Sequence, residues 1–180
     1  MSAKFDSQAV AAKRLNEVPF SGIRKVFDAV TQLEAQGRDV IHWQIGRTDF
    51  DTPAHAKQAA AESLARGDVH YAPNAGIGPL LKAIAARTEI DTGVETKPEQ
   101  VIVMAGANEG ILVSMLARVN PGDEVLVSDP NWHHYKSCAS LAGGVPVEVP
   151  TREEDSFALR TEEVEKRITP RTKMLCITSP

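Results

Sequence analysis

The sequence predicts an α/β fold in three layers (α/β/α), in which helices cover both faces of a mainly parallel sheet. From residue 101 onward, strand and helix patterns alternate, beginning and ending with a strand. The strand patterns are continuous apolar runs, which are typical of parallel strands buried on both faces. The chain has 180 residues, of which 42% are hydrophobic and 24% charged, and this suffices for one sizeable core.

Composition excludes several classes of function. The net charge is −4 and no basic cluster is present, so nucleic acid is not an expected partner. All apolar runs are far shorter than a membrane span, and residues 1–10 contain no apolar segment of a secretory signal. The two cysteines, Cys138 and Cys176, are expected to be reduced, buried thiols in a cytoplasmic protein.

The first part of the chain is expected to contain an arm, a helix and a short strand. Residues 1–19 show no strong period and are interpreted as a loose arm. Ser21 can cap a helix that runs to about Gln36, and Gly37 stands where a left-handed helix cap is expected. Val40–Ile45 has the pattern of a short strand.

Two helices are expected next. Thr52-Pro53 has the form of a helix start, with Thr52 as N-cap and Pro53 in the first helical position, and this helix ends at Gly67. Tyr71–Pro79 is rich in glycine and proline and is expected to be a loop. A helix from about Leu80 to Thr88 follows it.

The stretch Val101–Leu112 is the most informative of the sequence. Val101–Met104 is an apolar run with the pattern of a buried strand, Ala105–Asn108 is a turn, and a helical pattern follows. Small residues at Gly106 and Ala107 allow an anion to approach the backbone at the start of the helix, so the turn is a candidate phosphate site. An ordinary strand-to-helix turn is the alternative.

The remaining pattern repeats strand and helix to the end of the sequence. The expected strands are Glu124–Ser128, Val145–Val149 and Lys173–Ile177, and the expected helices are Trp132–Ala142 and Thr161–Ile168, with Thr161 as N-cap. Ligands of parallel sheets bind at the carboxyl ends of the strands. The turns Ala105–Asn108 and Asp129–Trp132 both follow strands, so they are expected at the same edge of the sheet.

Aromatic residues and histidines complete the candidate site. Trp132 follows a strand end, where its indole can stack on a flat cofactor ring; a core aromatic is the alternative. Tyr71 can offer its hydroxyl to a phosphate or to a partner chain, unless it is an ordinary loop tyrosine. His133 and His134 are adjacent and would point about 100° apart on a helix, so no metal site is expected.

Several stretches, in order, resemble the amino-terminal part of class I/II aminotransferases, which are fold-type-I enzymes dependent on pyridoxal 5′-phosphate (PLP). They are IGRTDFDTP at Ile45–Pro53, YAPNAGIG at Tyr71–Gly78, MAGANEGIL at Met104–Leu112, NPGDEVLVSDPNWHHY at Asn120–Tyr135, LAGGVPVEVPT at Leu141–Thr151 and ITPRTKMLCITSP at Ile168–Pro180. The resemblance implies the fold of the PLP-dependent transferase large domain.

The resemblance also implies roles for particular residues. Gly106, Ala107 and Asn108 match the turn that holds the cofactor phosphate, and Trp132 matches the aromatic residue that stacks on the pyridine ring. Tyr71 matches the tyrosine that reaches the phosphate of the neighbouring subunit, which implies a homodimer with shared active sites. In addition, Gly46 matches the glycine near the substrate carboxylate.

The sequence also departs from the family pattern. Thr48 stands where the family often has proline, and Leu81 stands where a basic residue is common. The family's Asn-Pro-Thr-Gly motif and its Schiff-base lysine lie beyond Ser179-Pro180. No Ser-x-x-Lys context surrounds the lysines considered, which are Lys57, Lys82, Lys97, Lys136 and Lys173. We therefore expect a truncated domain, no catalytic residue in the chain and no activity of these 180 residues alone.

The sequence-based interpretation is a PLP-dependent aminotransferase of amino acid metabolism that transfers an amino group between an amino acid and a 2-oxo acid. Residues 1–50 are expected to form an arm and helix of the small domain, and residues 51–180 the first part of the large domain. A PLP-dependent lyase or synthase of the same fold would share these residues. A non-catalytic PLP-domain regulator is the lesser alternative, because only about 20 residues precede the first matched helix, too few for a DNA-binding domain.

Overall fold

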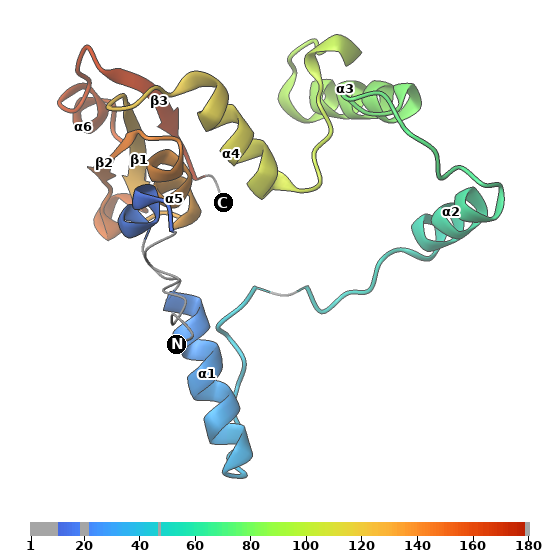
Figure 1. The fold of residues 1–180 in the computed structure, drawn as a ribbon, viewed down its shortest axis with the longest axis horizontal. Coiled ribbons are helices and arrows are strands. Elements are labelled where there is room, and N and C mark those ends of the chain that lie inside the picture. The colour runs from blue at the N-terminus through green and yellow to red at the C-terminus, as the bar shows by residue number, and fades with distance from the viewer. Residues whose placement is uncertain (1–10, 19–21, 47, 179–180) are drawn as a thin grey trace, which may run out of the picture. The chain divides into compact units, whose positions relative to one another are not determined.

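The computed structural model describes residues 11–18, 22–46 and 48–178 (Figure 1). Two compact units are present, one made of Met1–Asp28 with Ala105–Pro180 and the other of Ala29–Met104. In chain order the elements are η1 (Lys13–Glu17), α1 (Gly22–Ala35), α2 (Ala54–Ala65), α3 (Gly78–Thr92), η2 (Pro98–Gln100), α4 (Ala107–Arg118), β1 (Glu124–Asp129), α5 (His134–Leu141), β2 (Val145–Pro150), η3 (Glu153–Asp155), α6 (Thr161–Glu165) and β3 (Thr172–Cys176).

The first unit is built on a parallel sheet with the strand order β2-β1-β3. Leu126 in the middle of β1 pairs with Val147 of β2 and with Leu175 of β3. β1 is buried along five of its six residues, because it has a hydrogen-bonded neighbour on both sides and helices near its faces. The predicted α/β fold with a parallel sheet is confirmed.

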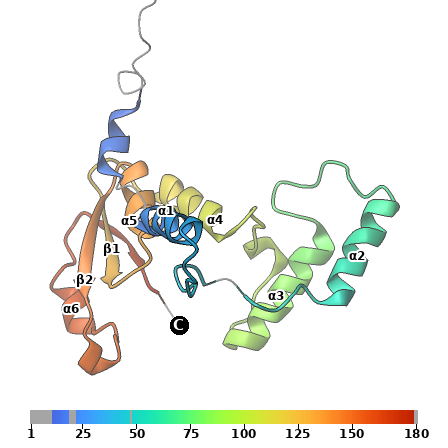
Figure 2. The ribbon, with the colours of Figure 1, turned by 90° about the horizontal axis from the view of Figure 1, so that it is seen from below.

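The core of this unit lies between the sheet and the helices α4 and α5. Met115 of α4 and Cys138 and Ala139 of α5 pack with Val125 and Val127, which share one face of β1. α6 contacts β2, and Figure 2 shows it on the side of the sheet away from α5. This arrangement leaves the carboxyl ends of the three strands at one edge.

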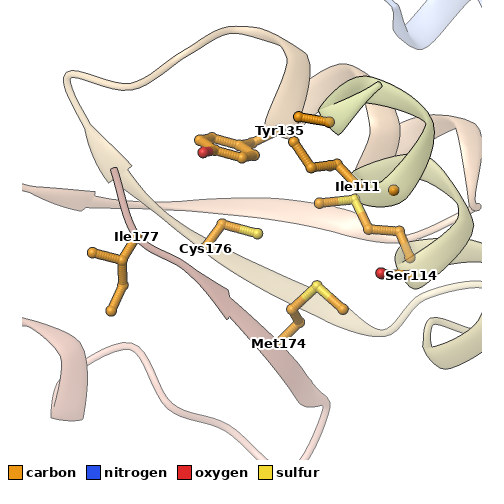
Figure 3. A pocket seen from close by; sticks show the side chains of 9 residues that line it. Ile111, Ser114, Tyr135, Met174, Cys176 and Ile177 are labelled. Carbon is orange, nitrogen blue, oxygen red and sulfur yellow. The ribbon is translucent and has the colours of Figure 1, made fainter. Parts of the chain in front are cut away.

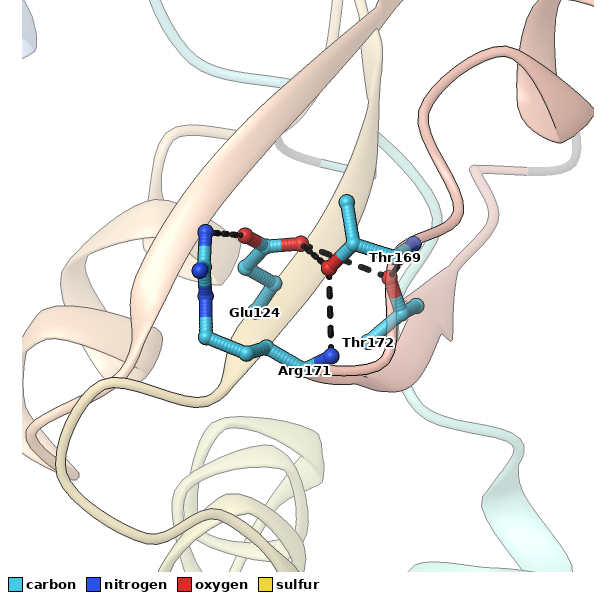
Figure 4. A network of polar contacts seen from close by, with 4 residues as sticks. All are labelled: Glu124, Thr169, Arg171 and Thr172. Atoms are coloured by element: carbon cyan, nitrogen blue, oxygen red, sulfur yellow. Dashed lines mark hydrogen bonds and ion pairs between the residues drawn. The ribbon is translucent and has the colours of Figure 1, made fainter.

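A network of hydrogen bonds and an ion pair connects the amino ends of β1 and β3 (Figure 4). The carboxylate of Glu124 is buried, with 5% of the residue exposed. It accepts hydrogen bonds from the Thr169 hydroxyl at 2.6 Å and from the Arg171 guanidinium, which also forms an ion pair with it. Because these donors satisfy the buried charge, Glu124 joins the start of β1 to the turn that leads into β3.

The second unit has few buried side chains. Only Val30 and Ala85 of its described residues are buried apolar residues. The Val103 N–H donates to the Ala75 carbonyl at 2.8 Å, and this contact brings residue 103 against Gly76. A Cβ on Gly76 would lie 2.8 Å from the Val103 Cγ2, and the φ of Gly76 is +119°, so this close approach requires glycine.

Most helices and three of the strands lie where the sequence predicts them. Gly37 has a φ of +75° after α1, as predicted, whereas the predicted cap Ser21 lies outside the described residues. Some ends differ: α3 continues to Thr92, and α5 begins at His134 rather than at Trp132. α6 ends at Glu165, well short of the predicted Ile168. Neither predicted threonine cap is present, because Pro53 is the N-cap of α2 and Arg160 that of α6.

Two predicted strands are wrong. Val40–Ile45 and Val101–Met104 are not paired in a sheet, and the first of them bends at residues 44 and 45. In the first, Ile41 and Trp43 are more than 80% exposed, and in the second Ile102 is 63% exposed. An apolar run becomes a strand only when a neighbouring backbone supplies a ladder of hydrogen bonds, and within the described residues neither run has one.

Candidate functional site

The amino end of α4 is the first part of the candidate site. The helix begins at Ala107, as the strand–turn–helix pattern predicts for its helical part. Gly106 is the N-cap residue, and no side chain caps the helix there by a hydrogen bond. The first N–H groups of α4 and the positive end of its dipole are therefore available to an anion.

Gly106 lies in open space. Its φ of 176° is extended backbone that any residue adopts, and a Cβ placed on it would meet nothing within 4 Å. The carboxylate of Glu109 accepts the Ala105 N–H at 2.6 Å, which ties the residue before the turn to the first turn of α4. The fold itself thus does not require glycine at position 106, whereas a ligand lying close to the backbone would.

A cavity of about 290 Å³ links the start of α4 with the end of β3 (Figure 3). Ala107 and Ile111 line it from α4, Tyr135 from α5, and Cys176 and Ile177 from the end of β3. The lining is mostly apolar. Because Ala107 and Ile177 share this cavity, the turn before α4 lies at the carboxyl edge of the sheet, as predicted from the sequence.

Trp132 follows β1 at the same edge. It is half-buried and belongs to an aromatic cluster that precedes and begins α5. Its indole stacks on the imidazole of His134, with ring centroids 4.4 Å apart and planes inclined by 14°. Tyr135 meets the indole at a right angle, with centroids 5.8 Å apart. Trp132 is therefore neither a fully buried core residue nor a free surface residue.

A second cavity, of about 480 Å³, brings the turn before α4 close to this cluster. Asn108 and Glu109 line it from α4, and His133, His134 and Cys138 from the other side. Asn108 and Trp132 are thus connected through His134, which lines the cavity and stacks on the indole. The structure brings together these two regions that the sequence analysis assigned to one site.

The other two predicted site residues belong to the second compact unit. Tyr71 is fully exposed, and a Cβ placed on Gly46 would meet nothing within 4 Å. Exposure of Tyr71 is what a hydroxyl with a partner in another subunit requires. The roles of Tyr71 and Gly46, like those of Gly106, Ala107, Asn108 and Trp132, stay predictions.

Burial changes the pKa values of three groups around the two cavities. The pKa of His134 lies below its ordinary value, chiefly because of burial and further because His133 is close. Burial raises the pKa of the Cys138 thiol, and burial together with Cys138 raises that of Cys176. Both cysteines are free thiols, and their raised pKa values disfavour the reactive thiolate.

Sequence reasoning misses His134 and Tyr135 as neighbours of the indole. It weighs His134 only as a metal ligand and gives Tyr135 no role. For Tyr135 the available signal is its spacing of three residues from Trp132, at the start of a predicted helix. The sequence offers no such signal for His134, whose stacking depends on side-chain torsions.

Membrane-spanning helices and metal clusters are both absent from the described ranges. None of their helices is long and apolar enough to cross a membrane. No group of three or more histidine, cysteine, aspartate or glutamate side chains in these ranges is arranged to hold a metal ion.

Comparison with known proteins identifies aminotransferases, in agreement with the resemblance of the sequence motifs. The sequence model of the family "Aminotransferase class I and II" matches residues 38–180. An aspartate aminotransferase of Pyrococcus abyssi is 43% identical over 168 residues, which are 93% of this chain and 42% of that protein. A probable aspartate/prephenate aminotransferase of Thermus aquaticus is 43% identical over 149 residues, 83% of this chain and 39% of that protein.

Solved structures agree with these relatives. A mutant aspartate aminotransferase of Thermus thermophilus matches with a TM-score of 0.90 and 39% identity, over 94% of this chain and 44% of that one. An alanine aminotransferase of Pyrococcus furiosus matches with a TM-score of 0.87 and 34% identity, over 92% and 42% of the two chains. The chain spans about two fifths of the length of the curated relatives it matches. On this similarity, the chain belongs to the class I and II aminotransferase family.

Proposed function

We propose that the protein transfers an amino group between an amino acid and a 2-oxo acid, with PLP as cofactor. The observation that carries the proposal is the uncapped amino end of α4 at the carboxyl edge of a parallel sheet, connected through His134 to Trp132. Family membership supports the reaction class, and the relatives' names support it over a lyase or a regulator. The names also favour aspartate as the amino donor to test first.

The residues present fit the cofactor. The open space at Gly106 and the N–H groups at the start of α4 suit a phosphate dianion, which the helix dipole would stabilise. Trp132 offers a flat ring held by its neighbours, against which a pyridine ring can stack. When bound, PLP supplies an electron sink for the carbanion formed at the amino acid Cα.

The chain's own residues would bind and orient the cofactor and the substrate. Gly106, Ala107 and Asn108 would hold the phosphate, and Trp132 would fix the tilt of the ring. Gly46 would lie near the substrate carboxylate. We further propose a homodimer in which Tyr71 of one subunit reaches the phosphate site of the other, in agreement with its full exposure, and a cytoplasmic location.

Residues 1–180 alone are proposed to be inactive. No lysine of this sequence follows a serine three positions earlier, which is the context of the covalently binding lysine in the family. Without that lysine, no base on the protein moves the proton between the substrate Cα and the cofactor. Residues 1–50 and 51–180 remain our proposed parts of the small and large domains.

The phosphate site is tested by comparing how strongly the protein retains PLP and pyridoxal, which lacks the phosphate. We expect PLP to be retained about five- to thirtyfold more strongly, because a charge-assisted contact to a helix terminus contributes on the order of 1–2 kcal/mol. Equal retention of both compounds would contradict the phosphate site. Glutamate formed from aspartate and 2-oxoglutarate then tests the reaction in a form of the protein that contains the family's Schiff-base lysine, whereas residues 1–180 with PLP should form none.

A further inference from the structure

Trp132 and His134 lie ring against ring, although only one residue separates them. The nearly parallel planes, inclined by 14°, and the 4.4 Å centroid distance define a stacked pair. His133 meets the same indole only at an edge, with centroids 6.4 Å apart and an angle of 73°. Of the two adjacent histidines, His134 therefore makes the face contact with the tryptophan.

His134 is itself held in place. It is the first residue of α5, so its backbone is fixed by the helix. Its ring packs against His133, with centroids 4.4 Å apart, and its Nδ1 is buried with no hydrogen-bond partner in the described part of the chain. Burial lowers the pKa of this imidazole and so favours its uncharged form, and a flat uncharged ring packs on an indole as an aromatic side chain does.

We propose that His134 is a positioning residue that fixes the plane of the Trp132 indole for stacking on the cofactor ring. The proposal rests on the proposed function, because it takes Trp132 as the stacking residue. Trp132 stands between β1 and α5, outside any regular element, so its backbone alone does not fix its two side-chain torsions. His134 supplies this restraint from the adjacent helix, and Tyr135 supports the indole at a right angle.

The test uses the full chain with Trp43→Phe, which leaves Trp132 as its single tryptophan. Trp43 is 89% exposed, so its replacement disturbs little packing. Fluorescence anisotropy and acrylamide quenching of Trp132 are then measured in His134→Ala, His134→Phe and His133→Ala without cofactor. We expect lower anisotropy and faster quenching in His134→Ala, recovery in His134→Phe, which restores a flat ring, and little change in His133→Ala.

A second measurement is the retention of PLP by the same variants. We expect about two- to tenfold weaker retention in His134→Ala, the factor that corresponds to one stacked aromatic pair, and recovery in His134→Phe. Unchanged anisotropy and quenching in His134→Ala would overturn the proposal. It would also be overturned by a freer indole with PLP retention equal to or tighter than wild type, since His134 would then occupy the place of the cofactor ring.

The two measurements separate this proposal from the proposed function. If no variant, including wild type, retains PLP better than pyridoxal, the proposed function fails. The fluorescence result still decides, without cofactor, whether His134 positions the indole. Circular dichroism of each variant verifies that the overall secondary structure is kept, and His134→Phe keeps the test valid if His134→Ala does not fold.

Discussion

At the scale of single residues, three glycines of this chain differ in their surroundings. Gly76 combines a left-handed backbone with a contact that leaves no space for a Cβ. Gly144 would place a Cβ 2.6 Å from a methyl group of Val119. Gly106 has neither restriction, because its backbone is extended and its surroundings are open. We therefore predict that a requirement for glycine at position 106, if measured, comes from a ligand bound there.

Gly106→Ala tests this interpretation. We expect the free energy of unfolding to stay the same or to rise by up to about 1 kcal/mol, because alanine restricts the unfolded chain. Retention of PLP should fall, because the methyl group takes space beside the helix start, while retention of pyridoxal should not. Urea unfolding and equilibrium dialysis measure the two effects. Gly144→Ala is the contrasting control, since its clash should lower stability by about 1–3 kcal/mol.

The backbone is strained at two single residues, Ser156 and Phe157. They have φ values of 51° and 55°, in the left-handed region that non-glycine residues avoid at a cost of roughly 1–2 kcal/mol each. The turn persists because the Phe157 N–H donates to the Arg152 carbonyl at 2.8 Å, which closes the loop around η3.

Ser156→Gly should relieve part of this strain. We expect stabilisation by up to about 1 kcal/mol, after the greater flexibility of glycine in the unfolded chain is subtracted. Thermal unfolding followed by circular dichroism measures it. Ser140→Gly, which lies in helix α5, is the matched control and should destabilise by roughly 0.5–1 kcal/mol. Destabilisation by both substitutions would show that the turn is not left-handed at residue 156.

At the scale of elements, the amino end of the sheet depends on one carboxylate. Hydrogen bonding by Thr169, followed by that of Arg171, holds the pKa of Glu124 below its usual range despite burial. A carboxyl group with a lowered pKa in the folded state stabilises the fold above its unfolded-state pKa. This stabilisation is lost as the pH falls through the folded-state pKa, so it disappears below the ordinary range of glutamate.

Glu124→Gln should therefore destabilise the protein at about pH 7, and its difference from wild type should shrink as the pH falls below the ordinary range of glutamate. Urea unfolding at several pH values measures the difference between the two proteins. Glu165→Gln, at an exposed position in α6, should show no such pH-dependent difference. A constant difference between wild type and Glu124→Gln at every pH would rule out the titration of Glu124 as its cause.

The strands also show which features of the fold a sequence pattern can predict. The prediction is correct for β1, β2 and β3, because these apolar runs are hydrogen-bonded neighbours in one sheet. Val40–Ile45 and Val101–Met104 have similar runs and similar local preference, but pairing is a property of two segments, and a single segment does not encode its neighbour. The turn at Gly106 could be predicted because its cause is local. The stacking of His134 could not, because it depends on side-chain torsions at the start of α5.

At the scale of the whole molecule, the apolar core is unevenly divided between the two units. Among the residues that the structure describes, eight of the ten buried hydrophobic ones belong to the unit that contains the sheet, and the other two are Val30 and Ala85. Since burial of apolar surface is the main stabilising contribution, residues 29–104 should open at a lower free energy than the sheet.

Hydrogen exchange measured by mass spectrometry tests this division. Peptides covering α2 and α3 should exchange their amides faster than peptides covering β1, by about 100-fold or more if the two regions differ by roughly 3 kcal/mol. Equal protection across the chain would contradict it. Addition of PLP should slow exchange at the start of α4 and after β1, whereas pyridoxal should have a smaller effect there.

The strand order β2-β1-β3 has a consequence for where ligands bind. From β1 the chain passes through α5 to a neighbour on one side, and from β2 it passes through α6 to a strand on the other side of β1. Since such crossovers are right-handed, a reversal of direction sends the two helices to opposite faces. The connections leaving the carboxyl ends of β1 and β2, which lead into α5 and α6, therefore diverge, and ligands of such sheets bind in the crevice where the connections part. Connectivity alone sets its location, so the side chains that line it can change through evolution, and with them the substrate preference, while the binding site stays in the same place.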